Sequence, residues 1–225
     1  KNNRGKVAGV IMQPYEATME WPAEGFLEGV KRLTHEHGAV LIFDEIRTGF
    51  RMALGGAQEH FGVVPDMAAV SKAIANGYPI SAVVGKRDVM GKAADTRLSS
   101  TFLVNSFPMA AALETLHELE EKGGIDYMWG LGKRLMKGLD EIVKEEGVDA
   151  EVKGAPPLPY LSFIGKNDDK RESIKKVFYT EAAQRGVLFH PNHCWFLSMG
   201  HTPGDVEKTL EVSRDSLKQA KKTIK

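Results

Sequence analysis

Two stretches of this chain decide its fold: Ala39-Val40-Leu41-Ile42-Phe43-Asp44-Glu45 and Met67-Ala68-Ala69-Val70-Ser71-Lys72. Each is a short apolar run that stops at a charged residue, which is typical of a buried strand in a parallel sheet. Ligands of open α/β sheets bind just outside the carboxyl ends of such strands. We therefore predict that Asp44 and Lys72 emerge at the same edge of one sheet.

A lysine and a carboxylate at one sheet edge indicate a particular chemistry. A desolvated lysine near a carboxylate is suited to form a Schiff base with a carbonyl compound. A buried carboxylate is suited to keep a pyridinium nitrogen protonated. The sequence therefore predicts a Schiff-base site built from Lys72 and Asp44.

The sequence around these runs alternates strands and helices. A strand at 7–12, a helix that opens at Pro22 and the strand at 39–43 form a strand–helix–strand unit, which implies a right-handed parallel crossover. Later patterns predict helices near 108–121, 125–146, 172–185 and 203–222, and strands near 160–164, 187–189 and 196–199. We predict an α/β fold with two domains, 1–123 and a smaller α+β domain at 124–225.

The composition is that of an ordinary globular protein. The 225 residues include 30 basic and 30 acidic ones, so no excess charge favours binding to nucleic acid or to an anionic membrane. No apolar run approaches the ~20 residues that a membrane-spanning helix needs. Cys194 is the only cysteine, which excludes an intrachain disulfide and indicates a reducing, cytoplasmic setting.

The motifs that follow the strands resemble a known enzyme family. They are, in order, Asp44-Glu45-Ile46-Arg47-Thr48-Gly49-Phe50-Arg51, Leu54-Gly55-Gly56-Ala57-Gln58, Pro65-Asp66, Ser71-Lys72 and Gly77-Tyr78-Pro79-Ile80. Together they resemble the class III pyridoxal-phosphate-dependent aminotransferases of fold type I, and most of all the glutamate-1-semialdehyde 2,1-aminomutase branch. The resemblance spans almost the whole chain. It implies that residues 1–123 are the C-terminal part of the cofactor-binding large domain, with a mostly parallel sheet, and that 124–225 are the small C-terminal domain.

The resemblance implies a role for each matching residue. The lysine matching Lys72 is catalytic and forms the internal aldimine with pyridoxal 5′-phosphate, and the aspartate matching Asp44 pairs with the pyridine nitrogen. The residue matching Ile46 packs against the cofactor ring. The residue matching Gln13, usually glutamate, lies near the cofactor's 3-hydroxyl or the substrate. Thr101 matches a threonine that reaches the cofactor phosphate of the neighbouring subunit, so the resemblance implies a homodimer.

These roles predict an aminotransferase that moves an amino group between an amine or amino acid and a carbonyl compound. Once substrate has displaced it, the amine of Lys72 can move a proton from the substrate Cα to the cofactor. Departures from the family pattern leave the substrate open, above all the segment 190–200, which looks shorter than the aminomutase version and lacks its acidic residue. Gln13 removes a negative charge, and Arg47 can clamp a substrate carboxylate if it points into the pocket. The alternatives are an aminomutase or epimerase that uses the same cofactor, and a truncated, non-catalytic relative.

Four potential metal ligands gather near the C-terminal end of the chain: His190, His193, Cys194 and His201. Their spacing matches no zinc-binding signature, so we predict no metal site here. We assign this segment to the wall of a substrate pocket or to a turn.

The resemblance also implies that something is missing from this chain. Family members carry roughly as much sequence again before the strand that begins near Val7. We therefore expect that this chain is part of a longer enzyme. A sheet that lacks strands exposes its edges and apolar faces. We expect the chain alone to bind the cofactor poorly.

Overall fold

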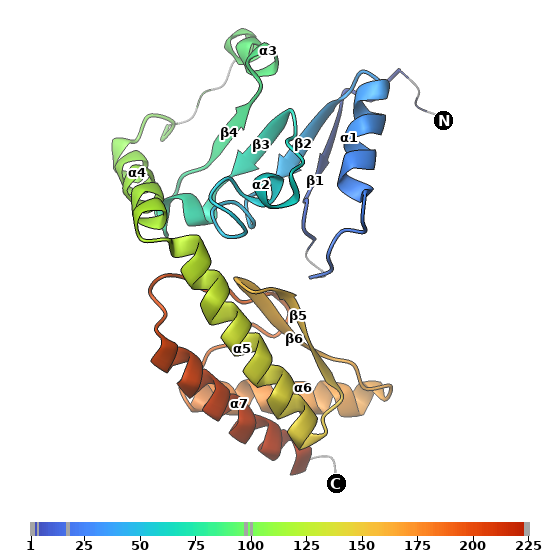
Figure 1. Cartoon of the computed structure of the whole chain (residues 1–225), viewed down its shortest axis with the longest axis vertical. Helices are drawn as coiled ribbons and strands as arrows, with labels where there is room; N and C mark the ends of the chain where they lie inside the picture. The colour runs from blue at the N-terminus through green and yellow to red at the C-terminus, as the bar shows by residue number, and fades with distance from the viewer. Residues whose placement is uncertain (1–2, 4, 17–18, 97–98, 100, 223–225) are drawn as a thin grey trace. The chain divides into compact units, whose positions relative to one another are not determined.

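A computed structural model describes residues 3, 5–16, 19–96, 99 and 101–222 (Figure 1). These residues fall into two compact units. Unit 1 holds the described residues up to Ile125, except Met19 and Glu20, which belong to unit 2 together with the residues from Asp126 onward. Unit 1 has a mostly parallel sheet and unit 2 an antiparallel strand pair with helices, which confirms the predicted α/β fold class.

Unit 1 is built on a four-stranded sheet in the order β1-β2-β3-β4 (Figure 1). The strands are β1 (Gly9–Met12), β2 (Val40–Asp44), β3 (Met67–Val70) and β4 (Ala82–Gly85). The first three are parallel, and β4 runs antiparallel to β3. Helix α1 (Phe26–Glu36) connects β1 to β2, as the sequence predicts. Its Leu27 packs against Leu41 and Phe43, both completely buried, and this cluster forms the core beneath one face of the sheet.

The remaining elements of unit 1 are short, apart from one helix. They are α2 (Ala57–Phe61), η1 (Lys72–Ala75), α3 (Arg87–Met90), η2 (Gly91–Asp95) and α4 (Ser106–Glu121). The expected start of the first helix is wrong, because α1 begins at Phe26 and not at Pro22. Gly25 takes a left-handed conformation with φ of 72°, which a regular helix cannot contain.

The two faces of this sheet differ in exposure. Residues that pair in register share a face, and side chains along one strand alternate between faces. Ile11 pairs with Ile42, and Asp44 pairs with Ala69, which pairs with Val83, so these five residues lie on the face opposite Leu41 and Phe43. On this face, Ile11 is 66% exposed and Val83 is 54% exposed. Parallel strands are normally covered on both sides, so the face that carries Asp44 is unusually open.

Unit 2 packs three helices with a strand pair (Figure 1). Its elements are α5 (Gly124–Glu146), of which the first two residues belong to unit 1, β5 (Ala150–Ala155), β6 (Leu158–Phe163), α6 (Asp168–Gln184) and α7 (Pro203–Lys222). Leu139, Phe178 and Leu217 are completely buried in one continuous core. The ring of Phe189 stacks on Phe178, with centroids 5.7 Å apart, and contacts Trp195 at 4.1 Å. No described helix of either unit is long and apolar enough to cross a membrane.

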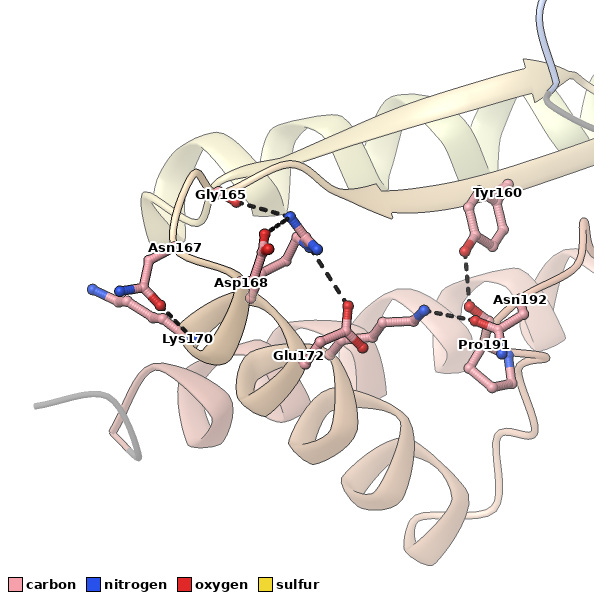
Figure 2. Close-up of polar contacts among 10 residues, drawn as sticks. Tyr160, Gly165, Asn167, Asp168, Lys170, Glu172, Pro191 and Asn192 are labelled. Carbon is pink, nitrogen blue, oxygen red and sulfur yellow. Dashed lines mark hydrogen bonds and ion pairs between the residues drawn. The ribbon is translucent and has the colours of Figure 1, made fainter.

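Helix α6 begins earlier than predicted because of a side-chain cap. The Oδ1 of Asn167 accepts a hydrogen bond from the backbone N–H of Lys170 at 2.9 Å (Figure 2). Asp168 and Asp169 occupy the first turn, where negative charge favours a helix. In the same turn, Arg171 bonds to Asp168 at 2.8 Å. The cap and these charges move the start of the helix from the expected residue 172 to Asp168.

The segment predicted to hold two short strands forms neither, while β5 was not predicted. The N–H groups of Trp195 and Leu197 donate to the carbonyls of Pro159 and Pro157 at 2.8 and 3.1 Å. Proline has no N–H to donate in return, so a strand ladder cannot form. Side chains secure the segment instead: the hydroxyl of Tyr160 donates to the Pro191 carbonyl at 2.8 Å (Figure 2).

Candidate active site

Asp44 and Lys72 lie at adjacent strand ends in unit 1. Asp44 is the last residue of β2, and Lys72 is the first residue of η1, just after β3. Asp44 of β2 pairs in register with Ala69 of β3, and Lys72 follows Ala69 shortly afterwards in the sequence. Because β2 and β3 are parallel, their carboxyl ends share one edge of the sheet, which is where ligands of such sheets bind.

Lys72 has an unusual backbone and a free side chain. Its φ is 49°, a left-handed conformation that residues with a Cβ seldom adopt. Backbone strain of this kind is concentrated at functional sites. The side chain is exposed, and no described residue forms a hydrogen bond or an ion pair with it. The expected desolvation of Lys72 is therefore not found in this chain, because the turn after β3 lies at the surface.

Asp44 presents one oriented oxygen and one free oxygen. Its Oδ1 accepts a hydrogen bond from the backbone N–H of Ile46 at 3.0 Å, which fixes the carboxylate at the end of β2. No other described residue bonds to this partly buried carboxylate. An oriented acid and an unengaged primary amine at one sheet edge are the groups needed to hold a ring nitrogen and an aldehyde carbon, so these residues fit pyridoxal phosphate.

Gln13 and Arg47 are joined directly in unit 1. Gln13 follows β1, and Arg47 follows β2. Arg47 is 6% exposed, and its Nη2 donates to Gln13 Oε1 and to the carbonyl of Tyr15, both at 3.0 Å. The guanidinium therefore ties the loop after β1 to the loop after β2. Arg47 is engaged with the protein and does not stand in the pocket as a free clamp.

Glu45 has a structural role that the sequence pattern did not indicate. This carboxylate is 1% exposed and accepts the backbone N–H groups of Ala57 and Gln58 at 2.8 Å each. The Thr48 hydroxyl also donates to it. Glu45 thus satisfies the first N–H groups of α2 and fixes the loop that carries Ile46, a partly buried residue. Helix α2 follows Gly56, which has no side chain that could cap the helix. The need for a cap from elsewhere in the chain is the signal that could have revealed this role.

Thr101 stands in an exposed turn before α4, and no described residue bonds to it. The turn and helix that follow it expose several large apolar side chains, which we call the α4 surface. Its members are Phe102, Val104, Phe107 and Leu113, which are 76%, 82%, 79% and 72% exposed. Several large exposed apolar side chains within a short stretch of sequence favour an interaction site.

The histidine-rich segment of unit 2 lines a cavity of about 550 Å³. Residues of this segment form hydrogen bonds with one another. Trp195 Nε1 donates to the His190 carbonyl at 3.1 Å, and the N–H of Ser198 donates to His201 Nδ1 at 3.1 Å. His193 lies beside His190, with ring centroids 5.7 Å apart. Within the described part of the chain, no group of side chains is arranged to hold a metal ion.

Fold and site together define a class of protein. The architecture matches part of the fold type I transaminases that use pyridoxal phosphate. More specifically, residues 1–204 match the family model "Aminotransferase class-III", and the chain belongs to this family. The resemblance inferred from the motifs is thereby confirmed.

Two curated relatives illustrate the range of the family. The 3-aminobutyryl-CoA aminotransferase of Cloacimonas acidaminovorans is 37% identical over 99% of this chain and 55% of its own length. The glutamate-1-semialdehyde 2,1-aminomutase 2 of Brevibacillus brevis is 34% identical over 95% of this chain and 53% of its own length. The chain therefore spans about half the length of the curated relatives it matches.

Two solved structures of related proteins have a similar fold over the length of this chain. The FumI protein of Sphingopyxis sp. MTA144, in its pyridoxal-phosphate internal aldimine form, superposes with a TM-score of 0.89 and 30% identity. That match covers 98% of this chain and 53% of FumI. An omega-transaminase from Sphaerobacter thermophilus also gives a TM-score of 0.89, at 27% identity, over 98% of this chain and 54% of its own.

Proposed function

We propose that this chain supplies the lysine-bearing part of a pyridoxal-phosphate-dependent aminotransferase, which moves an amino group between an amine or amino acid and a carbonyl compound. One observation carries the proposal. The free amine of Lys72 and the free carboxylate oxygen of Asp44 stand at adjacent carboxyl ends of two parallel strands. A family that transfers amino groups requires this pair of groups at one ligand site.

Each residue has a separate task in this proposal. When bound, pyridoxal phosphate supplies a sink for the electrons released at the substrate Cα. Lys72 Nζ would hold the cofactor through its aldehyde group, and the same amine would be the base that takes the proton from the substrate Cα. Asp44 would accept a hydrogen bond from the N–H of the ring nitrogen and so stabilise its positive charge. Ile46, whose backbone N–H bonds to Asp44, would pack against the ring without adding charge.

The proposal also assigns a role to each of the two units and to the α4 surface. Unit 1 is the C-terminal part of the cofactor-binding domain, and unit 2 is the small C-terminal domain. The α4 surface, whose side chains are exposed in this chain, would be covered by a second copy of the protein, and the Thr101 hydroxyl would donate to the cofactor phosphate of the neighbouring subunit. The single cysteine supports a reducing, cytoplasmic setting.

Covalent labelling tests the proposal. The chain is incubated with pyridoxal phosphate, reduced with sodium borohydride and mapped by peptide mass spectrometry. We expect the pyridoxyl group on Lys72, and we expect Lys72→Ala to remove it. Lys92→Ala, which changes another exposed lysine of unit 1, is the matched control and should keep the label. Equal labelling of all surface lysines, or unchanged labelling in Lys72→Ala, contradicts the proposal.

An aminomutase is the second candidate, because an aminomutase is 34% identical to this chain. An amino-acceptor screen separates the two reactions. A transaminase needs an acceptor such as pyruvate or 2-oxoglutarate for repeated turnover, whereas a mutase converts one substrate without any acceptor. Turnover of an amino substrate that does not depend on either acceptor favours the mutase.

A further inference from the structure

The contact between Gln13 and Arg47 fixes which end of the glutamine amide faces outward. A guanidinium has only donors, so it can bond only to the amide oxygen. Arg47 Nη2 does so, at 3.0 Å from Gln13 Oε1. The Nε2 of Gln13, with its two N–H donors, must therefore point away from Arg47. No described residue accepts a hydrogen bond from this Nε2.

The charge of Arg47 is not neutralised by the residues that the structure describes. None of their carboxylates forms an ion pair with this guanidinium, and both partners of its Nη2 are neutral oxygens. Its Nε atom is buried, and none of the described residues accepts a hydrogen bond from it. A buried cation that lacks a counter-charge is costly, and an anion bound close by would lower that cost.

Both features occur at the edge where the proposed chemistry takes place. Met12, the last residue of β1, pairs in register with Phe43, so Gln13 stands next to Asp44 along this edge. Two unused N–H donors and a positive charge behind them together favour a negatively charged group. The carboxylate that the register places beside Gln13 is that of Asp44, and its Oδ1 already accepts a hydrogen bond from the Ile46 N–H.

We propose that Gln13 is a substrate-binding residue that donates its amide N–H groups to a carboxylate of the amino donor or acceptor, and that Arg47 is a positioning residue that holds this amide in its donating orientation. This inference rests on the proposed function and names the class of its substrates: compounds with a carboxylate besides the reacting amine or carbonyl. Arg47 acts through Gln13 and through its charge, because its own side chain is almost fully buried.

Titration of the cofactor-free chain tests the inference without using activity. Three probes of matched size are butyrate, butyramide and butylamine. Binding is followed through the side-chain amide resonances of Gln13 in a nitrogen-15 NMR spectrum, assigned by their absence in Gln13→Glu. We expect butyrate to shift these resonances at concentrations on the order of tenfold lower than butyramide, since hydrogen bonds to a charged group are the stronger ones. Butylamine should not shift them.

The variants separate positioning from charge alone. Gln13→Glu replaces the donors with acceptors, so butyrate affinity, measured from other shifted resonances, should fall on the order of tenfold or more. Gln184→Glu makes the same charge change at an exposed site in unit 2 and should leave the affinity unchanged. Arg47→Met should weaken butyrate binding, and Arg47→Lys, which can still donate to Gln13 Oε1, should restore most of it. Circular dichroism checks that both Arg47 variants remain folded.

The inference is overturned if butyrate does not bind, if butyramide binds as well as butyrate, or if Gln13→Glu binds butyrate as the natural chain does. Equal affinity of Arg47→Met and the natural chain overturns the role of Arg47. If an Arg47 variant unfolds, Gln13→Glu against Gln184→Glu still decides the role of Gln13. Failure of the Lys72 labelling contradicts the proposed function and does not alter the titration, because the titration contains no cofactor.

Discussion

A Cβ added at Gly56 would lie 2.7 Å from the Oε2 of Glu45. Gly56 also has a φ of 83°, which side chains with a Cβ rarely adopt. The same carboxylate bonds to the N–H groups of Ala57 and Gln58, so backbone and carboxylate fit closely at this point. We expect Gly56→Ala to lower the free energy of unfolding by about 1–3 kcal/mol, measured by urea denaturation.

The carboxylate of Glu45 can be tested separately from the glycine. Glu45→Gln keeps the size of the side chain but replaces one acceptor oxygen with an N–H donor that faces the N–H groups of α2. This should cost about 1–3 kcal/mol of unfolding free energy. Glu24→Gln, at an exposed position of unit 1, is the control and should have little effect. Equal stability of the two variants would show that Glu45 does not hold the loop.

Asp66 should make the stability of unit 1 sensitive to acid. Its carboxylate accepts hydrogen bonds from Lys86 Nζ at 2.6 Å and from the Leu41 N–H and His35 Nε2 at 2.8 Å each. Burial by itself raises the pKa of Asp66, but these bonds outweigh it and lower the pKa from 3.8 to about 2. Because the folded pKa lies below the unfolded one, the stabilisation is complete above about pH 4 and is lost as the pH falls towards 2.

The size of this effect follows from the shift. One pKa unit corresponds to about 1.4 kcal/mol, so Asp66 contributes about 2 kcal/mol at neutral pH. We expect Asp66→Asn to unfold more readily at pH 7, and the difference from the natural chain to shrink between pH 4 and pH 2. Denaturation midpoints across this pH range measure it. Asp95→Asn, an exposed control, should show no such pH dependence.

The parts of the fold that depend on local patterns were predictable from sequence. The apolar runs ending at Asp44 and Lys72 correctly gave two neighbouring parallel strands, because such runs are buried wherever they occur. Strand β5 was missed because Glu151 and Lys153 make it look like a surface segment, and its pairing with β6 depends on a turn through two prolines. The bond between Arg47 and Gln13 joins positions 34 residues apart, and no local pattern encodes it.

Unit 2 contains one leucine in its core and one at its surface that can be compared directly. Leu139 is completely buried, whereas Leu188 is 89% exposed. We expect Leu139→Ala to lower the free energy of unfolding by about 2–5 kcal/mol, because it removes buried methyl groups and leaves a cavity. Leu188→Ala should change it by less than about 0.5 kcal/mol. Chemical denaturation followed by tryptophan fluorescence compares them, and similar losses would contradict this assignment of the core.

The α4 surface should govern self-association. Phe107 is 79% exposed, so a second copy that covers it would remove a large apolar ring from water. We expect the natural chain to form dimers with rising concentration and Phe107→Glu to shift the equilibrium towards monomer. Sedimentation velocity measures the change. Leu188→Glu places the same charge on an exposed leucine of unit 2 and should sediment like the natural chain; a monomer at every concentration would rule out this dimer surface.

Cofactor affinity should reflect the open face that carries Asp44. Ile11 and Val83 on this face are more than half exposed, and Lys72 at its edge is exposed too. Water therefore has access to both groups that would hold pyridoxal phosphate, and water competes with ion pairs and hydrogen bonds. We expect the cofactor to be lost from the chain during gel filtration unless it has first been reduced onto Lys72, with Lys72→Ala as the control for non-specific labelling. A chain that stays yellow through gel filtration without reduction would show that these residues bind the cofactor tightly by themselves, despite the exposure of the face.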